Sequence, residues 1–66
     1  MPLDLERIRK LREKAGLSQS QAAEKAGLNT RQRWHQIESG AIANIQLETL
    51  ESIAKALGAK AKDLLK

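Results

Sequence analysis

The sequence contains no cysteine, valine, phenylalanine or tyrosine, and its only aromatic side chain is Trp34. The absence of cysteine excludes disulfides, thiolate metal sites and cysteine nucleophiles within this chain. Strands favour valine and aromatic residues, whereas this chain carries ten alanines and ten leucines, so the composition predicts an all-α fold. The scarcity of aromatic rings also argues against binding single-stranded nucleic acid by base stacking.

Catalytic and membrane-related patterns are missing as well. One histidine, two aspartates and six glutamates provide no spacing for a catalytic triad, a metal-ligand set or a glycine-rich phosphate loop. We therefore expect a protein that is not an enzyme and that needs no cofactor and no metal. No apolar run approaches the roughly 20 residues of a membrane span, and the acidic start does not resemble a secretory signal. We expect a cytoplasmic protein without membrane contact.

The chain does have a basic surplus. Twelve lysines and arginines against eight acidic residues leave a formal charge of +4, which favours a polyanionic partner. Because stacking platforms are missing, double-stranded DNA is the favoured polyanion. A chain of 66 residues is one small fold, so we expect residues 1–66 to form a single domain. Packing or a partner subunit then has to stabilise it.

Four glycines divide the chain into helical segments. Each follows an apolar pattern with helical spacing, at the place where a left-handed residue ends a helix. The pattern predicts an amphipathic helix before Gly16, a second from about Gln19 to Ala26, a third from near Thr30 to Ser39, and a fourth from Leu47 to Leu57. Ser18 and Gln21 have the spacing of a capping box, and Leu64 with Leu65 predicts a last helical turn on the core.

The second and third segments have the features of two short helices that meet at a tight turn. Ala23 is small enough for close helix crossing, and Gly27 gives the turn its backbone freedom. Trp34 and Ile37 lie three residues apart, so both are expected to face the core. The remaining side chains of the third segment then face outward, and they are long hydrogen-bonding groups suited to base edges and phosphates: Arg31, Gln32, Arg33, His35 and Gln36.

Several motifs carry a family resemblance that spans nearly the whole chain. Residues 17–27 (LSQSQAAEKAG), 36–40 (QIESG), 47–50 (LETL) and 53–58 (IAKALG) resemble the phage repressor and Cro-type helix-turn-helix family in order and approximate spacing. The resemblance implies a compact five-helix, lambda-repressor-like bundle whose second and third helices form the DNA-binding pair. It also implies a homodimer that binds a pseudo-palindromic operator.

The resemblance also implies roles for individual residues. Arg31, Gln32 and Gln36 fall at positions where base contacts are usual, and Arg33 contacts either a base or a phosphate. Gln19 matches a phosphate-contacting position, assisted by Ser18, Gln21 and Thr30, and we expect His35 to face solvent or a phosphate. Residues that match Arg12 and Glu38 form an ion pair in the family, between the first helix and the end of the third.

This sequence departs from the family pattern at three places. The stretch from Gly27 to Ile37 is one residue longer than usual. This extra residue affects which side chains of the third segment meet the bases. The connector after Ser39 carries residues 41–43 (AIA) where lysine or arginine is common, so phosphate contact should be weaker there. Lys60 stands in place of a small polar cap, which predicts a short last helix. In the same connector we expect Ile45 in the core, and Ile42 either in the core or against a second subunit.

These features favour a sequence-specific regulator of transcription that binds double-stranded DNA, most simply a repressor that occupies an operator. The alternative is a protein-interaction module on the same fold, such as the antitoxin of a toxin–antitoxin pair. Fold alone does not separate the two classes. The basic, glutamine-rich third segment favours DNA, whereas the uncharged connector is compatible with contact to a protein partner.

Overall fold

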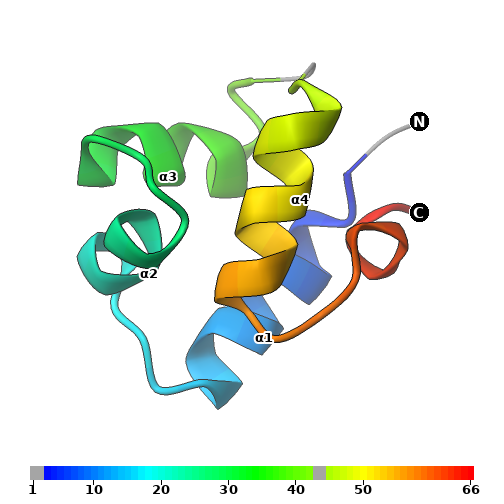
Figure 1. Cartoon of the computed structure of the whole chain (residues 1–66), viewed down its shortest axis with the longest axis horizontal. Coiled ribbons are helices and arrows are strands. Elements are labelled where there is room, and N and C mark those ends of the chain that lie inside the picture. Colours follow the sequence, from blue (N-terminus) through cyan, green and yellow to red (C-terminus); the bar gives the residue numbers. More distant parts are fainter. Residues whose placement is uncertain (1–2, 43–44) are drawn as a thin grey trace.

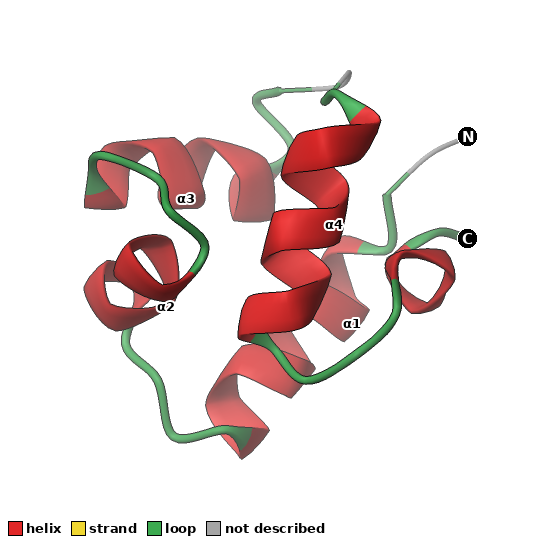
Figure 2. Cartoon of the chain, viewed as in Figure 1, coloured by secondary structure: helices red, strands yellow, loops and turns green. Residues whose placement is uncertain are grey.

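The computed structural model describes residues 3–42 and 45–66, and within them it contains four α-helices and one short 3-10 helix (Figures 1 and 2). The elements are α1 (Leu5–Lys14), α2 (Gln19–Lys25), α3 (Arg31–Ser39), α4 (Leu47–Ala56) and the 3-10 helix η1 (Ala61–Leu64). Among the described residues the only β-type pairing is a single antiparallel bridge between Leu3 and Leu65. The prediction of an all-α fold is therefore confirmed for this part of the chain.

The helix pair α2 and α3 lies on one side of α4, and η1 lies on the other side (Figure 1). Helix α4 packs against both α2 and η1, while α1 packs against α3 and η1. None of the helices in residues 3–42 and 45–66 combines the length and the apolar character that crossing a membrane requires.

The prediction of a fifth α-helix is wrong, because the last element is one 3-10 turn. Lys60 has no side-chain oxygen to cap the turn. The turn is held locally by the Lys60 backbone N–H, which donates to Asp63 Oδ2 at 3.2 Å, and by the Asp63 N–H, which donates to the Lys60 carbonyl at 2.9 Å. Leu64 is fully buried and holds the turn on the core, and Leu65 is already extended where it pairs with Leu3. The lysine at the cap position thus correctly predicted a short element.

Side-chain caps set the starts of α2 and α3. Ser18 Oγ accepts from Gln21 N at 3.1 Å while Gln21 Oε1 accepts from Ser18 N at 2.9 Å, so the predicted capping box is present. Thr30 Oγ1 accepts from Arg33 N at 3.2 Å, which makes Thr30 the N-cap of α3 and Arg31 its first residue. All four glycines that were expected to end helices have positive φ.

Two of these glycines position α3. Gly27, with φ of 75°, lies in the turn between α2 and α3, where a left-handed backbone lets the chain reverse within a few residues. Gly40, with φ of 85°, ends α3, and a Cβ atom there would lie 3.0 Å from Leu5 Cδ1. The end of α3 therefore lies close against the Leu5 side chain of α1.

The core is aliphatic apart from the indole of Trp34, which is fully buried together with Ile37, as predicted. Ile42 and Ile45 are half-buried and pack against this core, whereas Ala43 lies outside the described residues. Leu47 shares the helical spacing of the α4 core residues but is 66% exposed. It stands at the first position of α4, and the packing is provided by the later residues Leu50, Ile53 and Ala54 and by Leu57, which directly follows the helix.

Candidate nucleic-acid interface

Helix α3 has one buried side and one open side. Trp34 and Ile37 are fully buried, and the Glu38 side chain beside them is 8% exposed. In an α-helix each residue advances about 100°, so Gln32 and Gln36 lie on the side opposite these three. We call Gln32 and Gln36, together with Arg31 and His35 on one flank of them, the α3 outer face.

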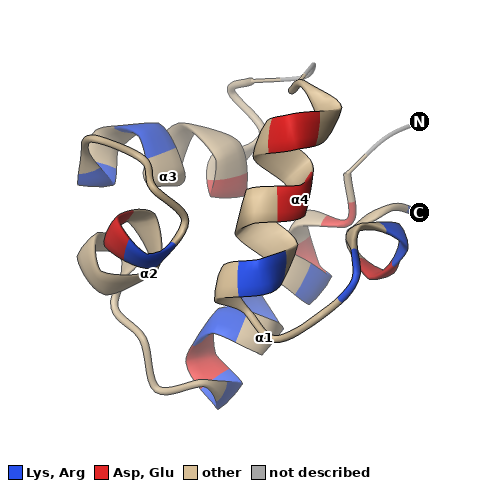
Figure 3. Ribbon diagram, in the orientation of Figure 1, with Lys and Arg blue, Asp and Glu red and all other residues tan. Residues whose placement is uncertain are grey.

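The outer face holds the long donors that the sequence predicted. Arg31, Gln32 and His35 are exposed and Gln36 is half-buried, so none is covered by the core. Arg33 is also exposed, but it lies on the opposite edge of the helix from Arg31 and His35. The basic residues of α3 lie in its N-terminal half, and the acidic residue lies near its C-terminal end (Figure 3). A guanidinium group donates to base edges and phosphates, and the two carboxamides can both donate and accept.

Three of the residues expected at phosphates already have a structural role. The oxygens of Ser18, Gln21 and Thr30 accept backbone N–H groups at the starts of α2 and α3. All three side chains are exposed, and the two hydroxyl groups and the Gln21 amide retain hydrogens that can be donated outward. These residues therefore hold the helix starts in place and present donors at the same time.

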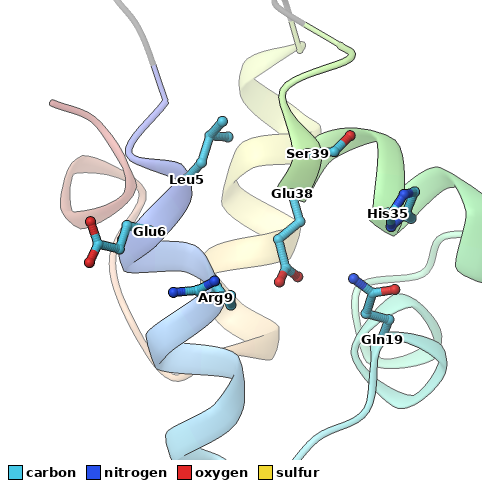
Figure 4. Close-up of a pocket in the computed structure, with 7 residues that line it drawn as sticks. All are labelled: Leu5, Glu6, Arg9, Gln19, His35, Glu38 and Ser39. Atoms are coloured by element: carbon cyan, nitrogen blue, oxygen red, sulfur yellow. The ribbon is translucent and has the colours of Figure 1, made fainter.

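Gln19 and His35 come together in an open cleft of about 600 Å³ between α1 and α3. The Gln19 side chain is half-buried and its amide points toward Glu38, while His35 and Ser39 stand along the edge of α3 (Figure 4). Ser39 Oγ donates to the Gln36 carbonyl at 3.3 Å. The cleft is lined by α1 on one side and by α2 and α3 on the other: Leu5, Glu6, Arg9, Gln19, His35, Glu38 and Ser39.

Glu38, one of the residues that line the cleft, forms a two-point ion pair with Arg12 that joins α3 to α1. Arg12 Nε and Nη2 each donate to one Glu38 oxygen at 3.0 Å, and the side chains are only 13% and 8% exposed. Arg12 Nη1 also donates to the Leu17 carbonyl at 2.9 Å, which ties in the connector before α2. One guanidinium thus links α1, this connector and α3.

Glu38 has a further partner that the sequence reasoning missed. The indole Nε1–H of Trp34 donates to Glu38 Oε2 at 2.6 Å. The spacing of four residues between Trp34 and Glu38 on one helix was the signal that could have revealed it, because such residues are neighbours on the helix surface. With Arg12 and Trp34 as donors, the buried carboxylate fixes both the position and the rotation of α3 against the core.

The charges of this pair hold each other in the ionised form. Burial alone raises the pKa of Glu38. The opposing effects are stronger and leave that pKa below its ordinary value: hydrogen bonds from Arg12 and Trp34, the positive charge of Arg12, and a hydrogen bond from the Gln19 amide. The hydrogen bond to Glu38 is the main reason that the pKa of Arg12 is raised. Glu38 is therefore more stable as a carboxylate in the folded chain than in the unfolded chain.

The lowered pKa of Glu38 predicts that the fold loses stability in acid. Because the folded pKa of Glu38 is lowered, its contribution to stability is complete well above the ordinary glutamate pKa of about 4.3 and is lost as the pH falls through the lower folded value. Urea unfolding at a series of pH values from neutral down through the folded pKa of Glu38 should show this loss of stability. In Glu38→Gln, which cannot ionise, the stability deficit relative to wild type should shrink as the solution becomes more acidic. An unchanged deficit at all pH values would contradict the assignment.

The register of α3 follows from its cap and its anchors. Residues 26–30 connect α2 to α3. With Thr30 as the cap and with Trp34 and Ile37 inward, Gln32 and Gln36 occupy the centre of the outer face.

Comparison with known proteins gives one family match. A family model described as a helix-turn-helix domain matches residues 6–65, a range that runs from α1 through η1. A search of curated proteins finds no match to the chain.

Proposed function

The chain belongs to the helix-turn-helix domain family, and from that premise we propose that it is a sequence-specific regulator of transcription of the phage repressor and Cro type. Residues 1–66 then form a single DNA-binding domain. The observation that carries the proposal is the α3 outer face, where Arg31, Gln32 and His35 stand exposed while Trp34 and Glu38 fix the opposite side of the same helix.

In this proposal α3 enters the major groove of double-stranded DNA. Arg31, Gln32 and Gln36 contact base edges, and Arg33, on the edge of the helix, contacts a base or the adjacent phosphate. The backbone is held by residues at the helix starts and in the cleft, which contribute position rather than sequence preference: Ser18, Gln19, Gln21, Thr30 and His35.

We propose further that two copies bind as a homodimer and repress by occupying a pseudo-palindromic operator. A two-fold axis would place the two α3 helices about 34 Å apart, which matches half-sites one helical turn apart. Sedimentation with and without operator DNA tests this arrangement, and a complex with one chain per site would rule it out.

A protein-interaction module, such as an antitoxin, is the second candidate. It is favoured by Leu47, the one large apolar side chain in the described residues that is exposed, at the start of α4. A contact made by such a side chain is apolar, so it should depend little on salt.

Titration of the purified chain against random and operator duplexes at two salt concentrations separates the two functions. Binding to DNA must weaken steeply with salt because counterions are released from the phosphates, and it must favour a sequence selected from a random pool. Absence of binding to every duplex at low salt would refute the proposal and leave the protein-interaction module.

The outer-face glutamines should control base preference. Gln32→Ala or Gln36→Ala is expected to weaken operator binding by about 1 to 3 kcal/mol and to leave binding to random duplexes nearly unchanged. Gln19→Ala should instead weaken binding to all sequences evenly. Gln46→Ala is the matched control, because Gln46 is exposed at the start of α4 and makes no side-chain capping bond. Equal losses on operator and random DNA for all of these variants would contradict the division between base and phosphate contacts.

A further inference from the structure

The cleft between α1 and α3 contains a basic side chain that the proposed interface does not use. Arg9 on α1 is exposed and lines the cleft opposite Gln19 and His35 (Figure 4). Resting on the proposed function, we propose that this cleft binds a DNA backbone phosphate and that Arg9 is its principal ligand. Helix α1 then becomes part of the DNA-binding surface.

The charge balance of the cleft favours an anion. Two carboxylates line it, but each is paired with a cation: Glu38 with Arg12, and Glu6 with Lys10, whose Nζ lies 3.1 Å from Glu6 Oε1. Arg9 forms no ion pair within residues 3–42 and 45–66. The positive charge that remains uncompensated in the cleft is therefore that of Arg9, which matches the single negative charge of a phosphodiester.

The cleft also lies where a DNA strand would pass. Arg31, His35 and Ser39 are spaced by four residues, so they form one row along α3 that leads from the outer face to the edge of the cleft. A strand whose bases meet Gln32 and Gln36 would bring its backbone along this row. His35 can donate a hydrogen bond from α3, and Arg9 supplies the positive charge from α1.

Helix α1 provides a matched control for this inference. Arg7 carries the same charge on the same helix and is also exposed, but it does not line the cleft. A general electrostatic attraction between α1 and DNA would depend on Arg7 as much as on Arg9, whereas a phosphate site in the cleft would depend on Arg9 alone.

The test measures operator and random-duplex binding of wild type, Arg9→Gln, Arg9→Lys and Arg7→Gln over a series of salt concentrations. Arg9→Gln should reduce the slope of log affinity against log salt by about 0.9, the value for one lost phosphate contact, and should weaken both duplexes by the same factor. Arg7→Gln should keep the wild-type slope, and Arg9→Lys should restore most of it. Circular dichroism should show the same thermal melting for all four proteins.

Two results would overturn the inference. The first is that Arg9→Gln and Arg7→Gln change the salt slope equally, while wild type still prefers its operator and Gln32→Ala still relaxes that preference. This result would contradict the phosphate site in the cleft and leave the proposed function intact. If wild type binds no duplex at all, both fail together.

Discussion

Replacing Glu38 with alanine is expected to destabilise the fold by about 3 to 5 kcal/mol, because it leaves the guanidinium of Arg12 largely buried without its partner. The substitution also removes the acceptor of the Trp34 indole N–H. A small domain has a total stability of only about 5 to 15 kcal/mol, so the substitution should remove a large share of the free energy of unfolding. Urea unfolding followed by far-UV circular dichroism measures the loss.

A surface carboxylate provides the control for this prediction. Glu24 on α2 is exposed, and Glu24→Ala should change stability by less than about 0.5 kcal/mol. The double variant Arg12→Met with Glu38→Leu should recover much of the loss, because it removes both charges together. Recovery should stay incomplete, since the Trp34 N–H remains buried without an acceptor. A loss near 1 kcal/mol for Glu38→Ala alone would mean that the pair acts as an ordinary surface ion pair.

The second large effect is expected at Trp34, the largest fully buried side chain. Trp34→Ala should cost about 3 to 5 kcal/mol, because removal of the buried indole leaves a cavity that the surrounding core fills only in part. Thermal unfolding followed by circular dichroism measures the effect.

Trp34→Phe separates packing from hydrogen bonding at this position. It keeps an aromatic ring but removes the N–H donor to Glu38, so it should cost about 1 to 3 kcal/mol and less than alanine. If Trp34→Ala instead left stability unchanged and abolished DNA binding, the indole would act as a contact to DNA, and its assignment to the core would be wrong.

Local patterns in the sequence predicted much of the fold. The features that it predicted correctly each depend on residues within a few positions of each other. They are the helix ends at Gly27 and Gly40, the capping box of Ser18 and Gln21, and the inward direction of Trp34. The length of the last element was harder to predict because two influences compete there. Leu64 favours a helical turn packed on the core, whereas Lys60 provides no side-chain cap that would extend this turn into an α-helix.

The candidate site was only partly accessible from the sequence. The outer face follows from helical spacing, once Trp34 and Ile37 are placed inward. The pairing of Arg12 with Glu38 joins residues 26 positions apart, so no local pattern contains it and only family resemblance suggested it. The cleft with Arg9 depends on how α1 and α3 pack together, which the spacing of residues within either helix does not specify.

The most direct test of the proposed function maps which residues contact DNA. An isotope-labelled chain is titrated with a duplex selected from a random pool, and the NMR signals of backbone amides and glutamine side chains are followed. We expect the largest changes at Arg31, Gln32 and Gln36 on α3, with the side-chain amides of Gln32 and Gln36 shifting on the operator but much less on a scrambled duplex. Binding that moved signals elsewhere and left the α3 outer face unchanged would contradict the proposal.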